Sequence, residues 1–226
     1  MKLIIDSRMR KQEKECLSKF GELIEIPYQN TVYEEISSHP DIFFCKIDNK
    51  LFRAPNLNIN IGTPGNSTIS IKYPNDVKYN ICQIGKNIVH NFQYTDPKIL
   101  EYIENQKLNN IHVNQGYSKC SICPTSSNSC ITSDEGIYET LKSKNIDTLL
   151  IKDETINLLD KNGIKTKMNG FIGGATAIIN NNFILFGDIE KMKNKDKILD
   201  HIKKYDLELI DFKNLEINDY GSVITI

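Results

Sequence analysis

Two short segments of the chain carry the side chains that are suited to covalent chemistry. Gly116-Tyr-Ser-Lys-Cys-Ser-Ile-Cys-Pro124 contains Cys120, and His39-Pro-Asp-Ile-Phe-Phe-Cys45 contains His39. A thiolate is a strong nucleophile, and an imidazole exchanges protons near neutral pH. The pair predicts a reaction in which Cys120 attacks a substrate and His39 acts as general acid and base.

Cys120 also has simpler interpretations. A cysteine in an apolar strand is usually an inert small hydrophobe. Lys119 could lower the pKa of its thiol, but neighbouring residues of a strand point to opposite faces. Cys120 and Cys123 have the C-x-x-C spacing, yet a redox site normally places that motif at a helix N-terminus. A zinc site would need two more ligands, and the sequence offers no second C-x-x-C and no H-x3-5-H pair.

His39 precedes Pro40 and Asp41, where a strand is expected to begin. Proline keeps the preceding residue extended, and residues two apart on a strand share one face. This geometry suits a proton-transferring imidazole beside a substrate-binding carboxylate. A purely structural role for His39 at the strand end is the alternative. His90 is expected to end a hairpin strand, and His201 to lie on a solvated helix.

The elements that must position these residues follow a repeated pattern. Degenerate versions of the cysteine segment recur four times, at His39–Cys45, Tyr79–Gly85, Gly173–Ile179 and Tyr220–Ile226. Each version is expected to open a unit of hairpin, helix and strand, and the units start roughly 40 to 55 residues apart. The predicted hairpins are Asp41–Cys45 with Lys50–Ala54, Tyr79–Ile84 with Asn87–Asn91, Tyr117–Cys123 with Ser129–Thr132, Gly174–Ile179 with Phe183–Phe186, and Gly221–Ile226 with Lys2–Ile5.

Some segments fall outside this pattern. Pro55–Lys78 is rich in glycine and proline and is expected to be a long loop or lid, with an edge strand at Thr68–Ile71. Thr31 is expected to start a short helix, and Glu154–Asp160 is predicted to be a helical insertion. We therefore predict a single α/β domain over residues 1–226. It would be a five-fold α/β propeller closed by pairing of the N- and C-terminal strands, which leaves no sheet edge exposed. An unrelated α/β or α+β domain is the alternative.

The composition gives only general indications of function. The chain has 226 residues and a formal net charge of -1, which gives no electrostatic reason to expect nucleic acid or an anionic membrane as a partner. No apolar run approaches the ~18 residues that a membrane span needs, so a cytoplasmic protein is expected. In that compartment the six cysteines are expected to be thiols.

The repeated units and the two motifs resemble the pentein fold of the guanidino-group-modifying enzymes. This superfamily includes arginine and agmatine deiminases, dimethylarginine hydrolase, amidinotransferases and the non-enzymatic translation initiation factor 6. Gly116–Pro124 is similar to the G-x-x-R-C-M-S/T-x-P segment of deiminases, and His39–Phe44 to their H-x-D-T-x-F segment. The histidine unit also precedes the cysteine unit by two units, as in the family. The compact size suggests a bacterial branch of the superfamily.

The resemblance implies roles for individual residues. Cys120 falls on the nucleophile, His39 on the acid/base and Asp41 on a substrate-binding carboxylate. Lys119 falls on the basic residue before the nucleophile and is predicted to contribute to substrate binding. The family's G-G-D segment is represented by Tyr220-Gly-Ser222, which has serine where an acid is expected. Asp219 or Asp6 is predicted to supply the missing substrate-binding carboxylate.

The resemblance implies a cysteine-dependent hydrolase or amidinotransferase that acts on a small guanidino or amidino compound and needs no metal or organic cofactor. A second hypothesis is a non-catalytic pentein-fold module that binds a protein or ribosomal partner. A redox or structural role for Cys120 and Cys123 is the third. The sequence does not specify the substrate, the acceptor or the oligomeric state.

Overall fold

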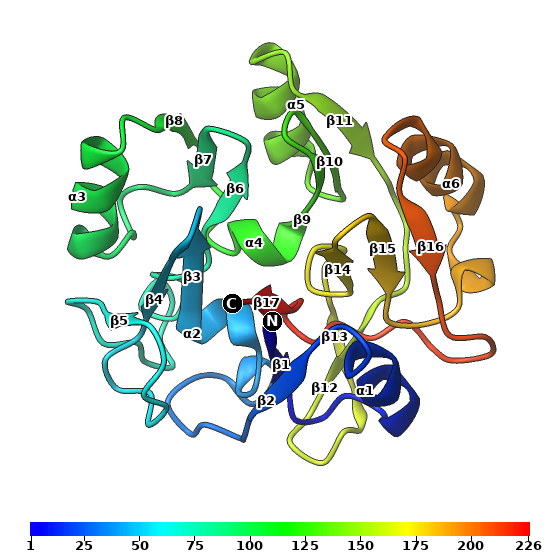
Figure 1. Cartoon of the computed structure of the whole chain (residues 1–226), viewed down its shortest axis with the longest axis horizontal. Helices are drawn as coiled ribbons and strands as arrows, with labels where there is room; N and C mark the ends of the chain where they lie inside the picture. Colours follow the sequence, from blue (N-terminus) through cyan, green and yellow to red (C-terminus); the bar gives the residue numbers. More distant parts are fainter.

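The computed structural model describes all of residues 1–226 as a mixed α/β fold. It contains five three-stranded sheets and one two-stranded sheet. Figure 1 shows the three-stranded sheets lying around the middle of the molecule, with most of the longer helices at the periphery. The sheets are separate, so they do not join into one closed sheet.

Each three-stranded sheet combines an antiparallel pair with a parallel third strand. The first three sheets are β17 (Ile224–Thr225), β1 (Lys2–Asp6) and β2 (Glu22–Ile26); β3 (Phe44–Ile47), β4 (Lys50–Arg53) and β5 (Thr63–Pro64); and β6 (Cys82–Ile84), β7 (Asn87–His90) and β8 (Asn109–His112). The other two are β9 (Ile122–Ser126), β10 (Ser129–Thr132) and β11 (Asp147–Leu150); and β14 (Thr176–Ile179), β15 (Asn182–Leu185) and β16 (Glu208–Ile210).

All five predicted hairpins are present. Three of them turn in two residues, and the first turn residue, which is Asp48, Gly85 or Asn180, has a positive φ that suits a tight turn. The fifth hairpin joins the two ends of the chain, with Leu3 opposite Thr225 in an antiparallel pair.

A helix connects the second and third strands in four of the five units. These helices are α1 (Lys11–Leu17), α3 (Pro97–Asn105), α5 (Glu135–Ser143) and α6 (Lys195–Lys204). The Asp96 and Asp134 carboxylates accept backbone N–H bonds at the starts of α3 and α5, which satisfies donors that helix ends leave open. The unit of β3 to β5 has an irregular connection in place of a helix.

Three local predictions are wrong. Residues 154–160 are not helical: β12 (Asn157–Leu159) pairs with β13 (Lys165–Asn169) as the two-stranded sheet, across a turn in which Gly163 has a positive φ. The third strand of the β3 unit is β5, and no strand forms at 68–71. The segment after Thr31 forms only the 3-10 helix η1 (Glu34–Ile36); a second 3-10 helix, η2 (Ile189–Lys191), precedes α6.

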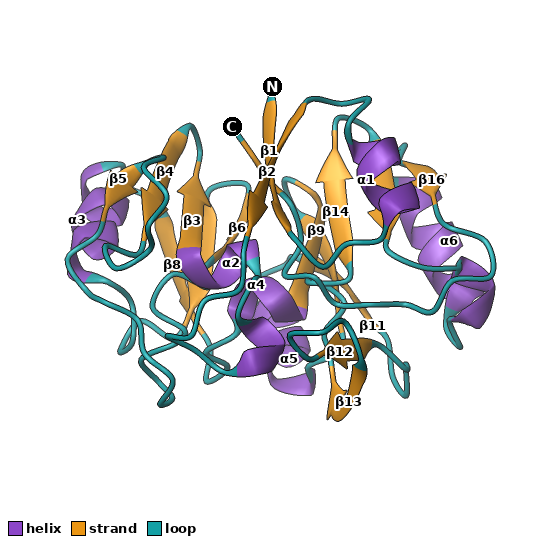
Figure 2. Cartoon of the chain, turned by 90° about the horizontal axis from the view of Figure 1, so that it is seen from below, coloured by secondary structure: helices purple, strands orange, loops and turns teal.

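Two short helices replace predicted strand residues at the start of two units. α2 (Pro40–Phe43) precedes β3, and α4 (Ser118–Ser121) precedes β9. Pro40 occupies the first turn of α2, where its fixed φ suits a helix and its missing N–H costs nothing. Both helices lie near the middle of the molecule (Figures 1 and 2). His39 therefore lies at the start of α2 and Cys120 lies within α4, whereas both were predicted to lie on strands.

The largest apolar cluster surrounds these central helices. It includes Phe43, Phe44 and Tyr79 and extends to Cys120. Figure 2 shows the two termini at one end of the molecule and the β12–β13 hairpin at the opposite end. None of the helices has the length and apolar character that crossing a membrane requires.

Candidate active site

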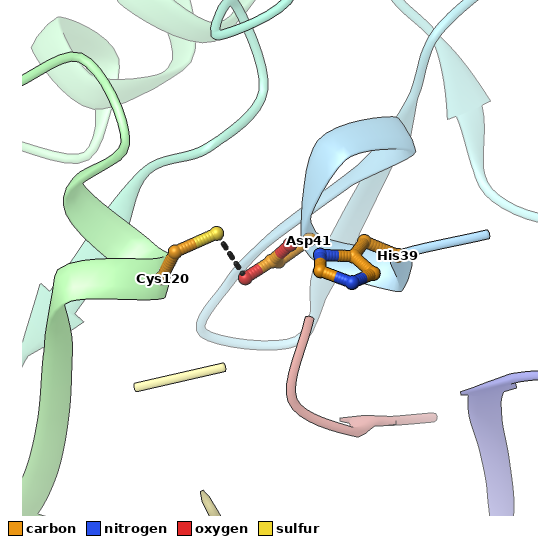
Figure 3. A group of neighbouring side chains, drawn as sticks. All are labelled: His39, Asp41 and Cys120. Carbon is orange, nitrogen blue, oxygen red and sulfur yellow. Dashed lines mark hydrogen bonds between the residues drawn. The ribbon is translucent and has the colours of Figure 1, made fainter. Parts of the chain in front are cut away.

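Cys120 lies on α4 with only 2% of its surface exposed. Its Sγ is 3.0 Å from Asp41 Oδ2, and the thiol donates a hydrogen bond to that carboxylate (Figure 3). Burial is the largest cause, and the charges of Asp41 and Asp219 come next; together they raise the pKa of the thiol well above its ordinary value. Cys120 is therefore a neutral thiol in this structure.

Asn80 holds Cys120 in place from a neighbouring unit. Its Oδ1 accepts the backbone N–H groups of Lys119, at 2.8 Å, and of Cys120, at 3.2 Å. Its Nδ2 donates to Cys120 Sγ at 3.1 Å and to the Asp41 carbonyl at 3.1 Å. The amide thus satisfies N–H groups that a four-residue helix leaves open and aims the sulfur at Asp41. Sequence reasoning missed Asn80, although it lies in the recurring segment Tyr79–Gly85.

His39 is completely buried and lies at the start of α2. Neither ring nitrogen makes a hydrogen bond. Nδ1 is 3.8 Å from Asp219 Oδ1, and Nε2 is 3.8 Å from Asp6 Oδ2. Burial, together with the nearby Arg8 guanidinium, lowers the pKa of the imidazole well below its ordinary value. The ring is therefore neutral and retains its full capacity for hydrogen bonding.

Asp219 provides a carboxylate at the place where Ser222 offers none. It is 1% exposed, and it accepts backbone N–H groups from Phe171 at 2.8 Å and from Gly221 at 2.9 Å. Burial and the charge of Asp41 raise its pKa to about 7. A carboxyl group with this pKa changes its charge near neutral pH.

Glycines make room for this cluster. A Cβ on Gly174 would lie 1.9 Å from Asp219 Oδ1, and a Cβ on Gly221 would lie 2.4 Å from the His39 Cβ. Gly221 also has a φ of +66°, which other residues adopt rarely. The Gly173-Gly174 and Gly221 positions of the sequence repeats thus allow the chain to pass close to the two ionisable side chains.

Asp6 is engaged by Arg8 within the protein. Arg8 Nε donates to Asp6 Oδ1 at 3.0 Å and Nη2 donates to Oδ2 at 2.6 Å, and the guanidinium also donates to the backbone carbonyls of Leu159 and Glu35. Desolvation by burial raises the pKa of Asp6, and Arg8 opposes that rise. Asp6 lies behind His39, with its carboxylate already bound by an internal cation.

A pocket of about 570 Å³ opens onto His39, Cys120 and Asp219. These three side chains are almost completely buried, so they form its inner end. The remaining walls are mainly aromatic and apolar, and they comprise Tyr33, Glu35, Ile36, Tyr73, Tyr117, Leu158, Met168, Asn169 and Phe171. The sequence analysis does not assign these walls: Leu158 lies on β12, within the residues predicted to form a helix, and Tyr73 lies in the segment Pro55–Lys78 that is predicted to be a loop or lid.

Hydrogen bonds and ring packing brace the aromatic walls of the pocket. The Tyr117 hydroxyl donates to Asp76 Oδ2 at 2.6 Å, and the Tyr117 and Phe171 rings stack with centroids 6.5 Å apart. Tyr73 packs edge-on against Tyr94. The aromatic surface is therefore held in place by hydrogen bonds and ring packing.

Asp41 and Lys119 do not line this pocket. Asp41 is fully buried beside Cys120, and burial raises its pKa. Lys119 Nζ donates to Ser222 Oγ at 3.1 Å and contributes to two smaller pockets, both of which Val223 also lines. Lys119 thus lies outside the pocket that Cys120 lines, and because the backbone there is helical, the opposite-face argument for a strand does not apply.

The other candidate groups separate into different environments. All six cysteines are free thiols, and Cys123 belongs to a different apolar cluster from Cys120. His201 was predicted to be solvated, but it is buried with its Nε2 2.9 Å from Thr125 Oγ1. Possible ligand atoms of His39, Asp41 and Cys120 lie within 4.8 Å of one another, so these three residues are the ones that could hold a metal ion.

Comparisons with known proteins place the chain in a family and identify its fold. A model described as "Family of unknown function (DUF6873)" matches residues 4–224. The search of curated proteins gives no match.

Solved structures with the same fold are more informative. An adduct of dimethylarginine dimethylaminohydrolase with 4-chloro-2-hydroxymethylpyridine aligns with a TM-score of 0.54 at 8% identity, covering 93% of this chain and 91% of that chain. Agmatine deiminase from C. jejuni aligns with a TM-score of 0.51 at 12% identity, covering 93% and 86%. DDAH from Pseudomonas aeruginosa, a cysteine-to-serine mutant complexed with citrulline, aligns with a TM-score of 0.52 at 7% identity, covering 93% and 91%. At these identities the similarity is one of fold.

Proposed function

The chain belongs to the family DUF6873, and we propose that it is a cysteine-dependent hydrolase of deiminase type, or an amidinotransferase, that acts on a small guanidino or amidino compound. The observation that carries this proposal is the meeting of Cys120, His39 and Asp219 at the inner end of one pocket. The fold shared with dimethylarginine dimethylaminohydrolase and agmatine deiminase supports the choice of compound class.

We also propose that the five three-stranded sheets are the blades of a pentein-like propeller. Support comes from their common strand order and from the pairing of the terminal strands β1 and β17. In this arrangement α2 and α4 are equivalent turns that open two different blades. The repeat then explains why His39 and Cys120, far apart in sequence, approach each other.

The substrate cation binds against the acidic inner end of the pocket. A guanidinium is planar and donates paired hydrogen bonds, which carboxylates accept well. Asp219 is the carboxylate at the inner end of the pocket, and the neighbouring aromatic rings favour a cation by cation–π attraction. Asp41 acts from behind Cys120, where its negative charge adds to the attraction without contacting the pocket.

Substrate binding also activates the nucleophile. The free site keeps Cys120 protonated because burial and two carboxylates oppose a thiolate. A bound guanidinium introduces a positive charge beside the sulfur, which lowers the pKa of the thiol. The thiol proton then passes to His39, and the new imidazolium is stabilised by Asp219, whose Oδ1 is 3.8 Å from Nδ1.

The thiolate attacks the central carbon of the guanidinium and forms a C–S bond, which gives a tetrahedral intermediate. His39 returns its proton to one nitrogen, the C–N bond to that nitrogen breaks, and ammonia or an amine departs. An amidino group remains attached to Cys120 as a cation.

Water or an acceptor amine then attacks the same carbon and gives a proton to His39. The C–S bond breaks, and Cys120 leaves as the thiolate. With water the product is a ureido compound, and the second proton of the water leaves with the ammonia or amine as its ammonium form. His39 finally returns its proton to Cys120, so the resting site is restored.

The test is a screen of guanidino and amidino compounds for ammonia, amine or ureido product, with Cys120→Ala measured in parallel. Turnover that disappears in Cys120→Ala supports the proposal and identifies the substrate. Turnover that persists in the variant rejects the covalent mechanism. If no compound reacts and Cys120 is no more reactive than Cys16, a non-catalytic module that binds a protein partner becomes the better account.

A further inference from the structure

The charges around the pocket are all of one sign. Asp219 and Glu35 are the two carboxyl groups that line the pocket. His39 is neutral, and no lysine or arginine lines the pocket. Arg8 is the cation near His39, but its donors are directed to Asp6 and to the carbonyls of Leu159 and Glu35. The pocket therefore has no free cation that could bind a carboxylate on the substrate.

The outer part of the pocket is apolar. Tyr33, Tyr73 and Met168 line it and have 43%, 41% and 57% of their surfaces exposed. A pocket of about 570 Å³ lies within the range of roughly 300–1,000 Å³ that encloses drug-sized ligands, so it accepts more than a guanidinium group. The part of the substrate that extends outward contacts this apolar mouth.

Glu35 gives the mouth a negative charge. It lines the pocket from η1, and its carboxylate forms no ion pair or hydrogen bond within the protein. A substrate carboxylate near Glu35 would meet a like charge with no lysine or arginine among the lining residues to offset it, which costs binding free energy. Glu35 is thus positioned to select against acidic substrates.

We infer that the substrate is a guanidino compound whose outer end is apolar and carries no free carboxylate. This inference rests on the proposed function, because it assumes that the guanidino group binds at Asp219 and Cys120. It separates the pocket from one built for free amino acids, whose carboxylate needs a cationic partner. Glu35 is the specificity-determining residue, and Met168 marks the apolar mouth.

The experiment measures binding calorimetrically in Cys120→Ala, so that turnover plays no part. The probes are butylguanidine, guanidinobutyrate and the primary amide of guanidinobutyrate. Butylguanidine and the amide are expected to bind at least about tenfold more tightly than guanidinobutyrate. A tenfold difference in Kd corresponds to ~1.4 kcal/mol of binding free energy. Glu35→Gln should reduce the gap between the carboxylate and its amide several-fold.

Met168→Lys supplies the missing cation and should tighten binding of the carboxylate relative to the amide. Ile164→Lys is the matched control, because Ile164 is also exposed, at 62%, but does not line the pocket. Equal or tighter binding of the carboxylate in the parent protein overturns the inference, and so does an equal effect of the two lysine substitutions.

Failure of the inference is distinguishable from failure of the proposed function. Selective binding of butylguanidine without turnover of any guanidine by the wild-type enzyme would leave the inference intact and reject the reaction. Turnover of guanidines together with tighter binding of guanidinobutyrate than of its amide would support the reaction and reject the inference. Absence of binding by all three probes would reject both.

Discussion

Two buried histidines have opposite surroundings, and the difference separates the proposed catalytic region from the supporting framework. His90 and His39 are both completely buried. His90 Nδ1 is 2.7 Å from Thr95 Oγ1, and its Nε2 is 3.1 Å from the carbonyl oxygens of Val77 and of Gly116. The ring nitrogens of His39 make no hydrogen bond, and the side chain lines a pocket.

The two environments predict different functions. The carbonyls require Nε2 of His90 to carry a proton, so its Nδ1 accepts from Thr95, and the ring ties β7 to the segment that leads to Cys120. Both ring nitrogens of His90 thus have hydrogen-bond partners, as buried polar groups in protein interiors usually do. His39 lacks such partners, and an unsatisfied buried ring beside a thiol is available to a bound substrate. The lesson is that burial alone does not identify a structural histidine.

The largest expected effect is the loss of activity in His39→Asn. Removing the proton carrier should lower kcat/KM by about 10²–10⁴, the usual contribution of general acid–base catalysis. Because the imidazole ring of His39 forms no hydrogen bond, its replacement should change stability by only about 1 kcal/mol. The measurement is steady-state kinetics on the substrate found in the screen, with urea unfolding in parallel.

His90→Asn is the matched control for that variant. It should keep turnover per folded molecule within a few-fold of wild type, because His90 does not line the pocket. A loss in His90→Asn as large as that in His39→Asn would remove the distinction between the two sites.

The second prediction concerns Asp219→Asn and the pH dependence of stability. The folded protein raises the pKa of Asp219 to about 7 from its ordinary 3.8, so the folded state binds the proton more tightly. Wild-type stability should therefore fall, relative to Asp219→Asn, as pH rises from about 4 to 7. At about 1.4 kcal/mol per pKa unit the change is on the order of 1–4 kcal/mol.

Urea unfolding of both proteins at several pH values measures this difference. The amide cannot ionise, so it serves as the reference even though it loses one backbone hydrogen bond at every pH. A difference in stability that stays constant from pH 4 to pH 8 would contradict the burial of an ionisable carboxyl beside His39.

The third prediction is the structural cost of removing His90. His90→Asn should destabilise the fold by about 1–3 kcal/mol, because buried carbonyls of Val77 and Gly116 lose their donor. Burial lowers the pKa of His90 to about 4 from 6.5. The stability that its neutral form provides is present above pH 6.5 and is lost as pH falls toward 4, so the variant should show a shallower acid slope. Thermal unfolding of both proteins between pH 4 and pH 7 measures this difference. Equal stability and an equal pH dependence in the variant and the wild type would contradict the prediction.

Much of the framework was predictable from the sequence. Period-two apolar runs and turn residues such as Asp48 and Gly85 fix the hairpins locally. The starts of α3 and α5 are also local signals, since Asp96 and Asp134 cap them, although the sequence had favoured Thr95 as the cap of α3. Gly163 and the residues before it also encode a turn, but the short β12 strand was mistaken for a helix, because a short apolar run does not distinguish the two.

The site was predictable only in part. Cys120 and His39 stand out by residue type, and Asp219 was a candidate because Ser222 left a carboxylate missing. Asn80 and the aromatic walls were missed because their contacts depend on how the units pack around α2 and α4. Asp6 and Lys119 were also candidates for substrate binding, and their present partners are Arg8 and Ser222, contacts that depend on the packing of distant segments.

The most direct test of the central claim compares a cationic and a neutral alkylating reagent, chloroacetamidine and chloroacetamide. Intact and peptide mass spectrometry would follow the modified cysteine. The account predicts that chloroacetamidine modifies Cys120 at least about tenfold faster than chloroacetamide does, because its positive charge favours the thiolate beside Asp41 and Asp219. Cys16, the one cysteine that is not fully buried, should show no such preference. Equal rates of the two reagents at Cys120, or modification of Cys16 alone, would contradict a cation-activated nucleophile.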